Sequence, residues 1–497
     1  MRKSDEGSTV SIWEATEDLL EGGAAVPDST EVCIVGGGIA GLTTAYLLSK
    51  AGSHVTVVDD GLIGGGETCR TTAHLSNALD DRIYRIEEWH GEDKAKLAVE
   101  SHGRAIDTIE KVAKDESIDC DFLRVDGYLF EADDGRGDDD LDKEFDAARR
   151  CGLDVEWVET QFGRSMRFPR QGQFHVLKYL RGLVDVIQAN GGRLISNTRV
   201  TEWEGGDAPV VKTSRGDIQS DRIVLATNYP LMSKMFAELP AYRTYAIGVE
   251  IPKGSVERAL YWDNADPYIY VRTQVDDEGE ILIVGGEDHR TAQANDGEER
   301  FRRLEEWTRR HFSSAGPVKY RWSGQFMETH DGLGFLGQYS DDEPNVFLIT
   351  GDSGMGMTHG TIGGMIVSDL IVGKQNPWVD VYLPGRIATQ SIKEAVPEII
   401  ASTVPYKDWV TGGDIDSVDD LKPGEGGILR DGLSKIACYR DDEGKLHKRS
   451  AVCTHMGCIV RFNSLERTWD CPCHGSRFST NGDPINAPAI APLGKAE

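Results

Sequence analysis

Four side chains near the C-terminus have the types and spacing of metal ligands. Cys453 and His455 form a C-x-H pair, and Cys471 and His474 form a C-x-x-H pair after fifteen intervening residues. Two thiolates and two imidazoles can hold the two irons of a [2Fe–2S] cluster, in which histidine ligation raises the reduction potential. The same set also suits tetrahedral zinc. The interleaved order favours the cluster, as do two further cysteines within the motifs that zinc would leave unused.

Both motifs resemble the cluster-binding loops of the Rieske iron–sulfur protein family, in the high-potential branch of the cytochrome bc complexes. The resemblance implies one iron on the two cysteines and the other on the two histidines. It also implies a disulfide between Cys458 and Cys473 and a hydrogen bond from Ser476 to a cluster sulfide. Phe478 stands where that branch has a tyrosine donor, which predicts a potential below that of the respiratory proteins.

A dinucleotide-binding pattern stands near the other end of the chain. An apolar strand at 31–35 runs into a glycine-rich turn and then a helix at 42–48. A second strand, 54–58, ends at Asp59, where a carboxylate can accept hydrogen bonds from an adenosine ribose. The glycines allow a tight turn, close approach to a pyrophosphate and close helix packing; they are Gly36, Gly38 and Gly41. This pattern predicts a dinucleotide but does not separate NAD from FAD.

Further segments resemble the D-amino acid oxidase/glycine oxidase (DAO) superfamily of flavoproteins, over roughly residues 31–375. They include 64–68, 223–228, 331–337 and 350–358. The resemblance implies FAD as the cofactor, and it adds flavin contacts to the three glycines and Asp59. These contacts are Thr71, Thr72, His74, Ala226, Thr227, Gly354, Met355, Gly356, Met357 and Thr358. His74 is a candidate for covalent flavin attachment, as in some members of the superfamily, or for a polar contact.

The catalytic candidates are Tyr270, Arg272 and His289. Tyr268, Tyr270 and Arg272 share one face of a predicted strand, since side chains alternate along it. Such a face can clamp a substrate carboxylate, with arginine as a bidentate fork. The alternative is a surface arginine beside core aromatics. His289 and His359 are candidates for acid–base work or for structural histidines.

The fold class that follows is an α/β FAD-binding domain (Rossmann-like, DAO/glutathione-reductase type) with a mixed α+β substrate subdomain and a small all-β Rieske domain. An N-terminal extension at 1–30 precedes the DAO-type oxidoreductase at 31–375. Its FAD-binding parts are about 31–80, 172–230 and 331–375, and its substrate subdomain is about 81–171 and 231–330. A linker at 376–408 leads to the Rieske domain at 409–497.

Composition excludes some partners. A net charge of −29 and a pI near 4.8 argue against nucleic acid, because nothing offsets phosphate repulsion. No stretch reaches the length of apolar residues that a membrane span needs, and residues 1–30 lack a basic start followed by an apolar core. These features predict a cytoplasmic protein without a membrane span. The implied disulfide is unusual for that compartment.

The expected function is that of an FAD-dependent dehydrogenase. It oxidises an amine or amino-acid C–N substrate by hydride transfer to FAD, and single electrons pass through the cluster to an external acceptor. A flavin stores two electrons whereas the cluster carries one, and an oxidase that reduces oxygen directly would not need the cluster. Two alternatives remain: a hydroxy-acid or other C–O dehydrogenase on the same fold, and a non-enzymatic flavin/iron–sulfur redox sensor or electron carrier.

Overall fold

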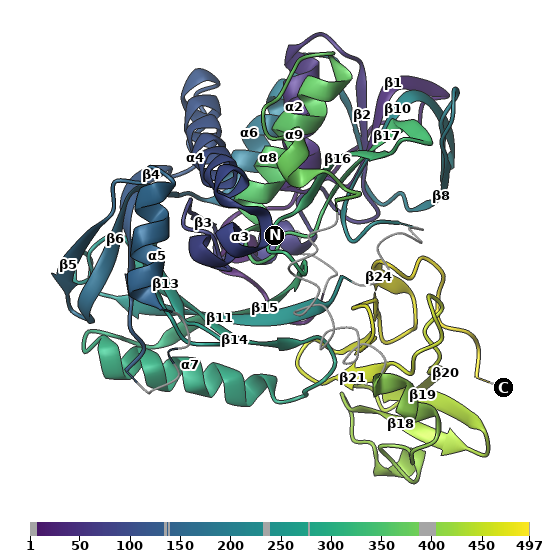
Figure 1. Cartoon of the computed structure of the whole chain (residues 1–497). Helices are drawn as coiled ribbons and strands as arrows, with labels where there is room; N and C mark the ends of the chain where they lie inside the picture. The colour runs from purple at the N-terminus through teal and green to yellow at the C-terminus, as the bar shows by residue number, and fades with distance from the viewer. Residues whose placement is uncertain are drawn as a thin grey trace.

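The computed structural model describes residues 7–133, 137, 140–231, 239–276, 279–386 and 404–496 of the 497. Two large sheets face each other in the first three quarters of the chain, and a smaller β domain follows beside them (Figure 1). This arrangement confirms the predicted fold class. Residues 387–403, most of the predicted linker, lie outside the described residues.

The first sheet is mostly parallel and has eight strands. Its central strands are apolar on both faces, as expected for parallel strands covered by helices. In spatial order the path is β16 (Phe335–Ser340), β17 (Glu343–Thr350), β10 (Gly216–Asn228), β1 (Ser29–Val35), β2 (Val55–Val58) and β7 (Arg193–Ile195), with β8 (Val200–Glu204) and β9 (Val210–Thr213) beside β10. The covering helices are α2 (Ile39–Lys50), α6 (Val176–Ala189) and α8 (Gly356–Ile371), and α4 (Glu92–Asp115) packs against α8.

The second sheet is mostly antiparallel and has nine strands. Its order is β15 (Val318–Met327), β11 (Ala241–Ile251), β14 (Glu280–Arg290), β13 (Tyr270–Val275), β12 (Leu260–Asp263), β4 (Leu123–Phe130), β6 (Gly163–Gln173) and β3 (His74–Leu75), with β5 (Glu156–Thr160) on β6. Helix α7 (Gly297–His311) lies along its outer face (Figure 1), and α3 (Ile83–His90), α5 (Leu141–Arg150) and α9 (Val379–Tyr382) complete the module. Strand β3 pairs with this sheet although it falls within the first predicted FAD-binding part.

The C-terminal domain consists of two small antiparallel sheets around one core. The first contains β18 (Gly426–Asp431), β19 (Ser434–Arg440) and β20 (Leu446–Ser450). The second contains β21 (Arg461–Asn463), β22 (Thr468–Asp470), β23 (Arg477–Phe478) and β24 (Pro484–Asn486). Short 3-10 helices, η2 (Val404–Trp409) and η3 (Val418–Asp420), precede them, and η1 (Glu67–Arg70) follows β2 near the start of the chain.

The N-terminal segment is integral to the first module. Helix α1 (Ile12–Thr16) carries Trp13, which is fully buried and donates from Nε1 to the carbonyl oxygen of Thr71 at 2.6 Å. Thr9 donates to both carboxylate oxygens of Glu466 in the C-terminal domain, from its amide and its hydroxyl. Neither contact could be predicted from the sequence, because residues 1–30 carry no recognisable motif.

Buried ion pairs join the C-terminal domain to the first module. Glu466 is 1% exposed, and its Oε1 lies 3.5 Å from Nη1 of Arg70, which is 3% exposed. Arg243 pairs with Asp470 at 3.5 Å, and Arg477 pairs with Glu67 at 3.4 Å. Each pair has one member in each module, so each module neutralises charges that are buried in the other.

These charges determine the ionisation of Glu466. Burial alone would raise its pKa, yet three guanidinium groups around it outweigh burial and lower the pKa to about 2. They belong to Arg70, Arg243 and Arg477.

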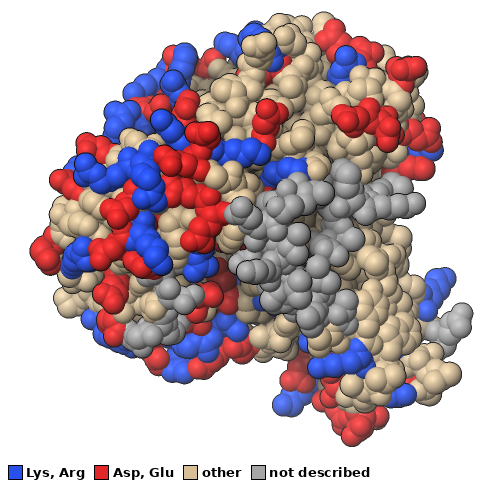
Figure 2. All heavy atoms as spheres, viewed as in Figure 1, with Lys and Arg blue, Asp and Glu red and all other residues tan. Residues whose placement is uncertain are grey.

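On the outer surface, acidic and basic side chains are interspersed around α3, α4 and α5, and a broad face of the C-terminal domain shows few charges (Figure 2). The charge of −29 is therefore not gathered into one patch on this face. Among the described residues, no helix combines the length and apolar character required to cross a bilayer.

We predict that Glu466→Gln weakens the junction between the modules. The pKa depression from 4.5 to about 2 corresponds to about 3 kcal/mol of stability. A depressed carboxyl pKa stabilises the folded state fully above pH 4.5, and that contribution is lost as the pH falls towards 2. Urea unfolding at pH 7 should therefore show a loss of this size, which shrinks on acidification.

Glu100→Gln, an exposed position on α4, is the matched control and should leave the free energy of unfolding unchanged. Equal losses in the two variants, or a loss that does not vary with pH, would show that Glu466 does not stabilise the junction by its charge.

Candidate functional site

A cavity of about 350 Å³ lies between the two sheets and reaches the C-terminal domain. All predicted flavin contacts except Gly41 line it, and they come from elements far apart in the sequence. The glycine-rich turn after β1, the 71–74 loop, the end of β10 and the start of α8 all meet here. Its size is within the range of ligand sites.

The glycines of the first turn are required because other backbone atoms approach them too closely for a side chain. Gly36 has φ of 109°, and a Cβ there would lie 2.3 Å from the carbonyl oxygen of Ala226. A Cβ on Gly41 would lie 1.9 Å from the carbonyl oxygen of Gly36, so Gly41 permits helix α2 to pack on β1 rather than lining the cavity. Asp59 accepts a hydrogen bond from the Gly37 amide at 2.6 Å and still borders the cavity.

Aromatic and acidic side chains form the wall on the side of the second sheet. The hydroxyl of Tyr268 donates to Oδ1 of Asp80 at 2.5 Å, and Tyr270 and Thr244 share a hydrogen bond of 2.7 Å between their hydroxyls. The ring of His74 meets that of Tyr270 edge-on at 5.5 Å. Burial and the charge of Arg272 lower the pKa of His74 to about 3, so its imidazole is neutral at pH 7.

Arg272 does not line the cavity. Its side chain is fully buried, and Nη1 donates to the carbonyl oxygens of Thr72, Ala73 and Phe174. Those bonds fasten the loop that carries His74. The structure therefore corrects both sequence interpretations of Arg272, since it is neither a carboxylate clamp in the cavity nor a surface residue.

The two candidate histidines also hold structural positions. His289 lies outside the cavity, where its ring contacts the Tyr245 hydroxyl at 3.0 Å and the Arg290 carbonyl oxygen at 2.8 Å. His359 lines the cavity, but its ring bonds to the Asp352 carbonyl oxygen and accepts from the Gly334 amide. Burial lowers the pKa of each imidazole to about 4.

Sequence reasoning predicted Asp59 but missed three other acidic residues of the cavity. Asp80, Asp288 and Asp352 all line it, and burial raises the pKa of Asp288 and of Asp352 to about 7. Asp352 stands inside the glycine-rich segment 350–358, which was a usable signal. Asp80 and Asp288 stand in ordinary loop and strand contexts, and only the fold brings them to one wall.

The predicted cluster ligands converge in the C-terminal domain. The 453–458 and 471–476 loops each turn back on their first cysteine, with the amides of Gly457 and Gly475 donating to the carbonyl oxygens of Cys453 and Cys471. The thiols of Cys453 and Cys471 are hydrogen-bonded to each other. The His455 and His474 rings stand edge-to-face at 5.0 Å. Two thiols and two imidazoles, one of each from each motif, thus lie close together.

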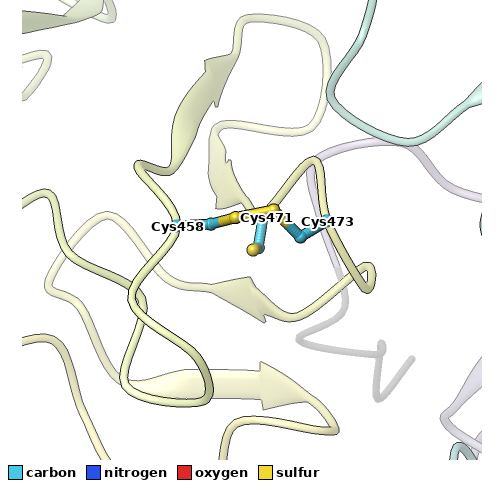
Figure 3. A group of neighbouring side chains, drawn as sticks. All are labelled: Cys458, Cys471 and Cys473. Atoms are coloured by element: carbon cyan, nitrogen blue, oxygen red, sulfur yellow. A yellow bond between two sulfur atoms is a disulfide. The ribbon is translucent and has the colours of Figure 1, made fainter. Parts of the chain in front are cut away.

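This ligand set fits a [2Fe–2S] cluster. The Nδ1 atom of His455 is buried and has no hydrogen-bond partner among the described residues, as a metal-binding nitrogen requires. A disulfide joins Cys458 to Cys473, which confirms the predicted bond, and the Cys471 sulfur lies close beside it (Figure 3). The disulfide removes two of the nearby sulfurs from the ligand set and ties the two loops together.

Neighbouring side chains complete the cluster environment. Ser476 is fully buried, lies within hydrogen-bond reach of the Cys453 thiol and accepts from the Ala489 amide at 3.0 Å. Phe478 is fully buried in the same core and carries no hydroxyl to donate. A tyrosine at position 478 would add one hydrogen-bond donor near the cluster ligands, and Phe478 does not supply it.

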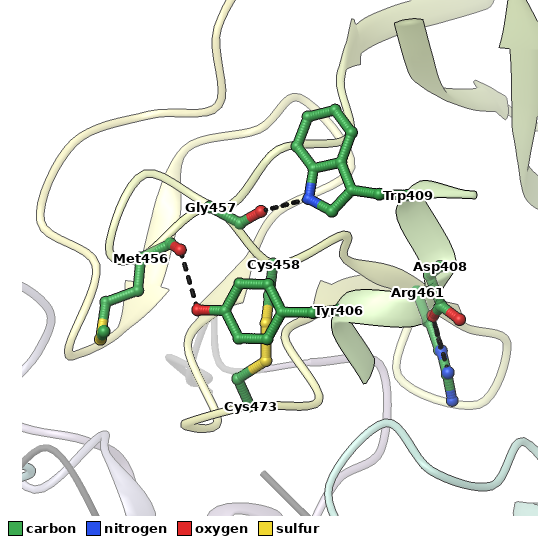
Figure 4. Close-up of a disulfide and its surroundings, with 8 residues drawn as sticks. All are labelled: Tyr406, Asp408, Trp409, Met456, Gly457, Cys458, Arg461 and Cys473. Carbon is green, nitrogen blue, oxygen red and sulfur yellow. Dashed lines mark hydrogen bonds and ion pairs between the residues drawn. A yellow bond between two sulfur atoms is a disulfide. The ribbon is translucent and has the colours of Figure 1, made fainter. Parts of the chain in front are cut away.

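The segment before the domain is fastened across the first cluster loop. Tyr406 donates to the Met456 carbonyl oxygen at 3.0 Å, and Trp409 donates to that of Gly457 at 2.9 Å (Figure 4). Asp408 pairs with Arg461 at 2.7 Å. Helix η2 therefore packs as part of the C-terminal domain, although 404–408 fall within the predicted linker.

Comparison with known proteins agrees with this geometry. The family model of FAD dependent oxidoreductases (DAO) matches residues 31–370, and the Rieske [2Fe-2S] domain model matches residues 413–497. The chain belongs to the DAO family of FAD-dependent oxidoreductases and carries a C-terminal Rieske domain. Its cofactors are accordingly FAD and a [2Fe–2S] cluster.

Individual relatives share all or part of this architecture. The putative Rieske 2Fe-2S iron-sulfur protein YhfW of Bacillus subtilis is 30% identical over 97% of this chain and 96% of its own length. Gamma-glutamylputrescine oxidoreductase of Escherichia coli is 27% identical over 69% of this chain and 84% of its own. The structure of glycine oxidase from Geobacillus kaustophilus has a TM-score of 0.60 at 18% identity, covering 73% of this chain and all of that one.

We predict that Gly36→Ala removes FAD without removing the cluster. A side chain there combines a strained φ with a clash against a backbone oxygen, which should weaken FAD binding about tenfold or more. The ratio of flavin absorbance to the reduced-cluster EPR signal in purified protein measures this. Gly52→Ala shares the positive φ but meets nothing within 4 Å, so it should retain FAD.

We also predict that Phe478→Tyr raises the cluster potential. One added hydrogen bond to the more negative reduced state corresponds to about 40–65 mV for one electron. Redox titration followed by EPR gives the potential, and Ser476→Ala should shift it in the opposite direction. Phe462→Tyr places a hydroxyl elsewhere in the same core and serves as the control. An unchanged potential in Phe478→Tyr would contradict the assigned position of the ring.

Proposed function

We propose that this chain is a dehydrogenase that oxidises the C–N bond of an amine or amino acid and delivers the electrons through its Rieske domain to an external acceptor. When bound, FAD accepts a hydride equivalent from carbon, and the cluster carries one electron at a time. The relatives support the substrate class, since one is named as a gamma-glutamylputrescine oxidoreductase and another as a glycine oxidase.

One contact carries the proposal that the two centres are coupled. Gln325 forms part of the cavity wall, and its Nε2 donates to the carbonyl oxygen of Gly475 at 2.9 Å. Gly475 directly follows His474, one of the predicted cluster ligands. A single side chain therefore connects the flavin cavity to the cluster loop, which supports electron transfer between the two centres.

The junction supports the same route at two further points. Ala489 lines the cavity, and its amide donates to the Ser476 hydroxyl next to the Cys453 thiol. Tyr229 of the first module faces the His455 ring at 6.5 Å. The cluster loops thus lie against the FAD-binding module and not on the far side of their own domain.

The cavity residues have separate tasks in this proposal. Tyr270 remains the catalytic candidate, since it borders the cavity beside His74 and Thr244. Arg272 positions the 71–74 loop through its three backbone bonds. His289 lies outside the cavity, so we assign it no contact with substrate.

We predict that an amine substrate added anaerobically bleaches the flavin and produces a reduced Rieske EPR signal in step with it. His455→Ala, which removes a cluster ligand, should leave flavin bleaching intact and abolish reduction of a one-electron acceptor. His447→Ala lies in the same domain away from the cluster loops and is the control.

Three outcomes contradict the proposal in different ways. A bleached flavin beside an oxidised cluster that dithionite can still reduce rules out the internal route. Bleaching by hydroxy acids alone, with a carbonyl product and no amine released, identifies a C–O dehydrogenase. An absence of steady turnover with any artificial acceptor favours a sensor or carrier.

A further inference from the structure

The wall of the cavity beside the second sheet carries acidic and aromatic side chains, which bear on the charge of the substrate. We propose that the substrate is a cationic alkylamine or polyamine and not an α-amino acid, with Asp80 and Asp288 as its recognition residues. This inference rests on the proposed function as an amine dehydrogenase and narrows its substrate class.

The charges that line the cavity are mostly negative. Its carboxylates are Asp59, Asp60, Glu67, Asp80, Asp288 and Asp352, its guanidinium groups are Arg70, Arg82 and Arg199, and no lysine of the described residues joins them. The arginines are already engaged by protein oxygens. Arg70 bonds to the Ser323 carbonyl, Arg82 to the Asp263 carbonyl and Arg199 to the Asp60 carboxylate. Each of the three guanidinium groups is thus already held by a protein oxygen.

Asp80 lies against the predicted flavin contacts. A Cβ on Gly354 would meet Oδ2 of Asp80 at 2.7 Å, so the carboxylate borders the glycine-rich loop before α8. Its Oδ1 accepts from Tyr268. The Tyr268 and Tyr270 rings lie 5.4 Å apart and line the cavity together. Aromatic faces beside a carboxylate attract ammonium groups through the ring quadrupole.

Asp288 faces the same wall from β14. Its Oδ1 atom is buried and has no hydrogen-bond partner among the described residues. Burial raises the pKa of this carboxyl to about 7, and the charge of Asp80 contributes in the same direction. The Asp288 carboxyl is hydrogen-bonded to the Thr244 side chain, but no cation among the described residues forms an ion pair with it. A buried carboxylate with an unpartnered oxygen is costly, and a bound cation would pair with that oxygen and supply a counter-charge.

The position of Arg272 supports the same conclusion. An amino-acid carboxylate needs a cation or donors at the reacting centre, and the arginine on the predicted strand face is buried behind the 71–74 loop, bonded to backbone oxygens. A substrate carboxylate at this wall would instead meet Asp80 and Asp288. Like-charge contact of this kind discriminates against the wrong substrate as effectively as attraction selects the right one.

Binding of two near-isosteric ions to the FAD-containing full chain tests the inference without turnover. Tetramethylammonium and trimethylacetate have nearly the same shape and opposite charge, and the absorbance of the bound flavin reports saturable binding. We expect the cation to bind at least about tenfold more tightly than the anion. Asp288→Asn should weaken cation binding by about 10- to 100-fold, the effect of losing a charged partner.

Asp185→Asn, an exposed position on α6, is the control and should bind both ions as the unaltered protein does. Asp80→Asn provides a second variant, and the ion preference of the unaltered protein decides the question if either variant loses FAD. Tighter binding of trimethylacetate, no saturable response to tetramethylammonium, or an Asp288→Asn variant identical to the control would overturn the inference.

This readout is independent of electron transfer. Cation binding in a protein whose cluster stays oxidised would leave the inference standing and reject the internal route. Anion preference in a protein whose cluster is reduced by substrate would reject the inference and support the internal route.

Discussion

The arrangement of the whole molecule depends on charges buried between its two modules. Glu466 enters the first module from the β21–β22 turn, where its carboxylate meets Arg70 and the Thr9 hydroxyl. Removing one partner of a buried pair leaves an uncompensated charge, which destabilises far more than the intact pair stabilises. Neither module can therefore separate without exposing or stranding ions that the other neutralises, and the Rieske domain is held in one orientation.

That fixed orientation gives the cavity a third wall. The two sheets of the DAO module enclose most of it, and residues 484–490 of the Rieske domain close another side. Glu67 takes part in both the junction and the cavity. It lines the cavity, accepts a hydrogen bond from the backbone amide of Gln325 and pairs with Arg477. The same contacts that stabilise the domain interface thus place the cluster loops beside the flavin cavity.

The cavity itself combines two kinds of residue. Glycines and small side chains leave room for a cofactor along the first sheet, whereas tyrosines and carboxylates occupy the wall of the second. Arg272 shows how a residue of the right type can serve the site indirectly, since its bonds to the Thr72 and Ala73 carbonyls hold the loop that carries His74. In the function we propose, charge and shape at Asp80, Asp288 and the two tyrosines select the substrate.

The sequence determined the fold class and, through two family resemblances, the cofactors. The spacing of the glycines at 36, 38 and 41 indicates a dinucleotide, because the backbone must approach it closely. The spacing of the cysteines and histidines in the two loops indicates a metal centre, because metals accept only certain ligand atoms. The disulfide between Cys458 and Cys473 followed from a family resemblance and is present. Local patterns of this kind can be recognised in the sequence because each depends on a few neighbouring residues.

Only the tertiary structure decided which residues line the cavity and how the modules meet. The periodicity that placed Tyr270 and Arg272 on one strand face could not show that Arg272 is buried behind the 71–74 loop, where it bonds to Thr72, 200 residues away in the sequence. Glu466, Asp80 and Asp288 look like ordinary acidic residues in the sequence. Their roles arise from long-range burial, where the cost of an isolated charge depends on partners that the linear order does not reveal.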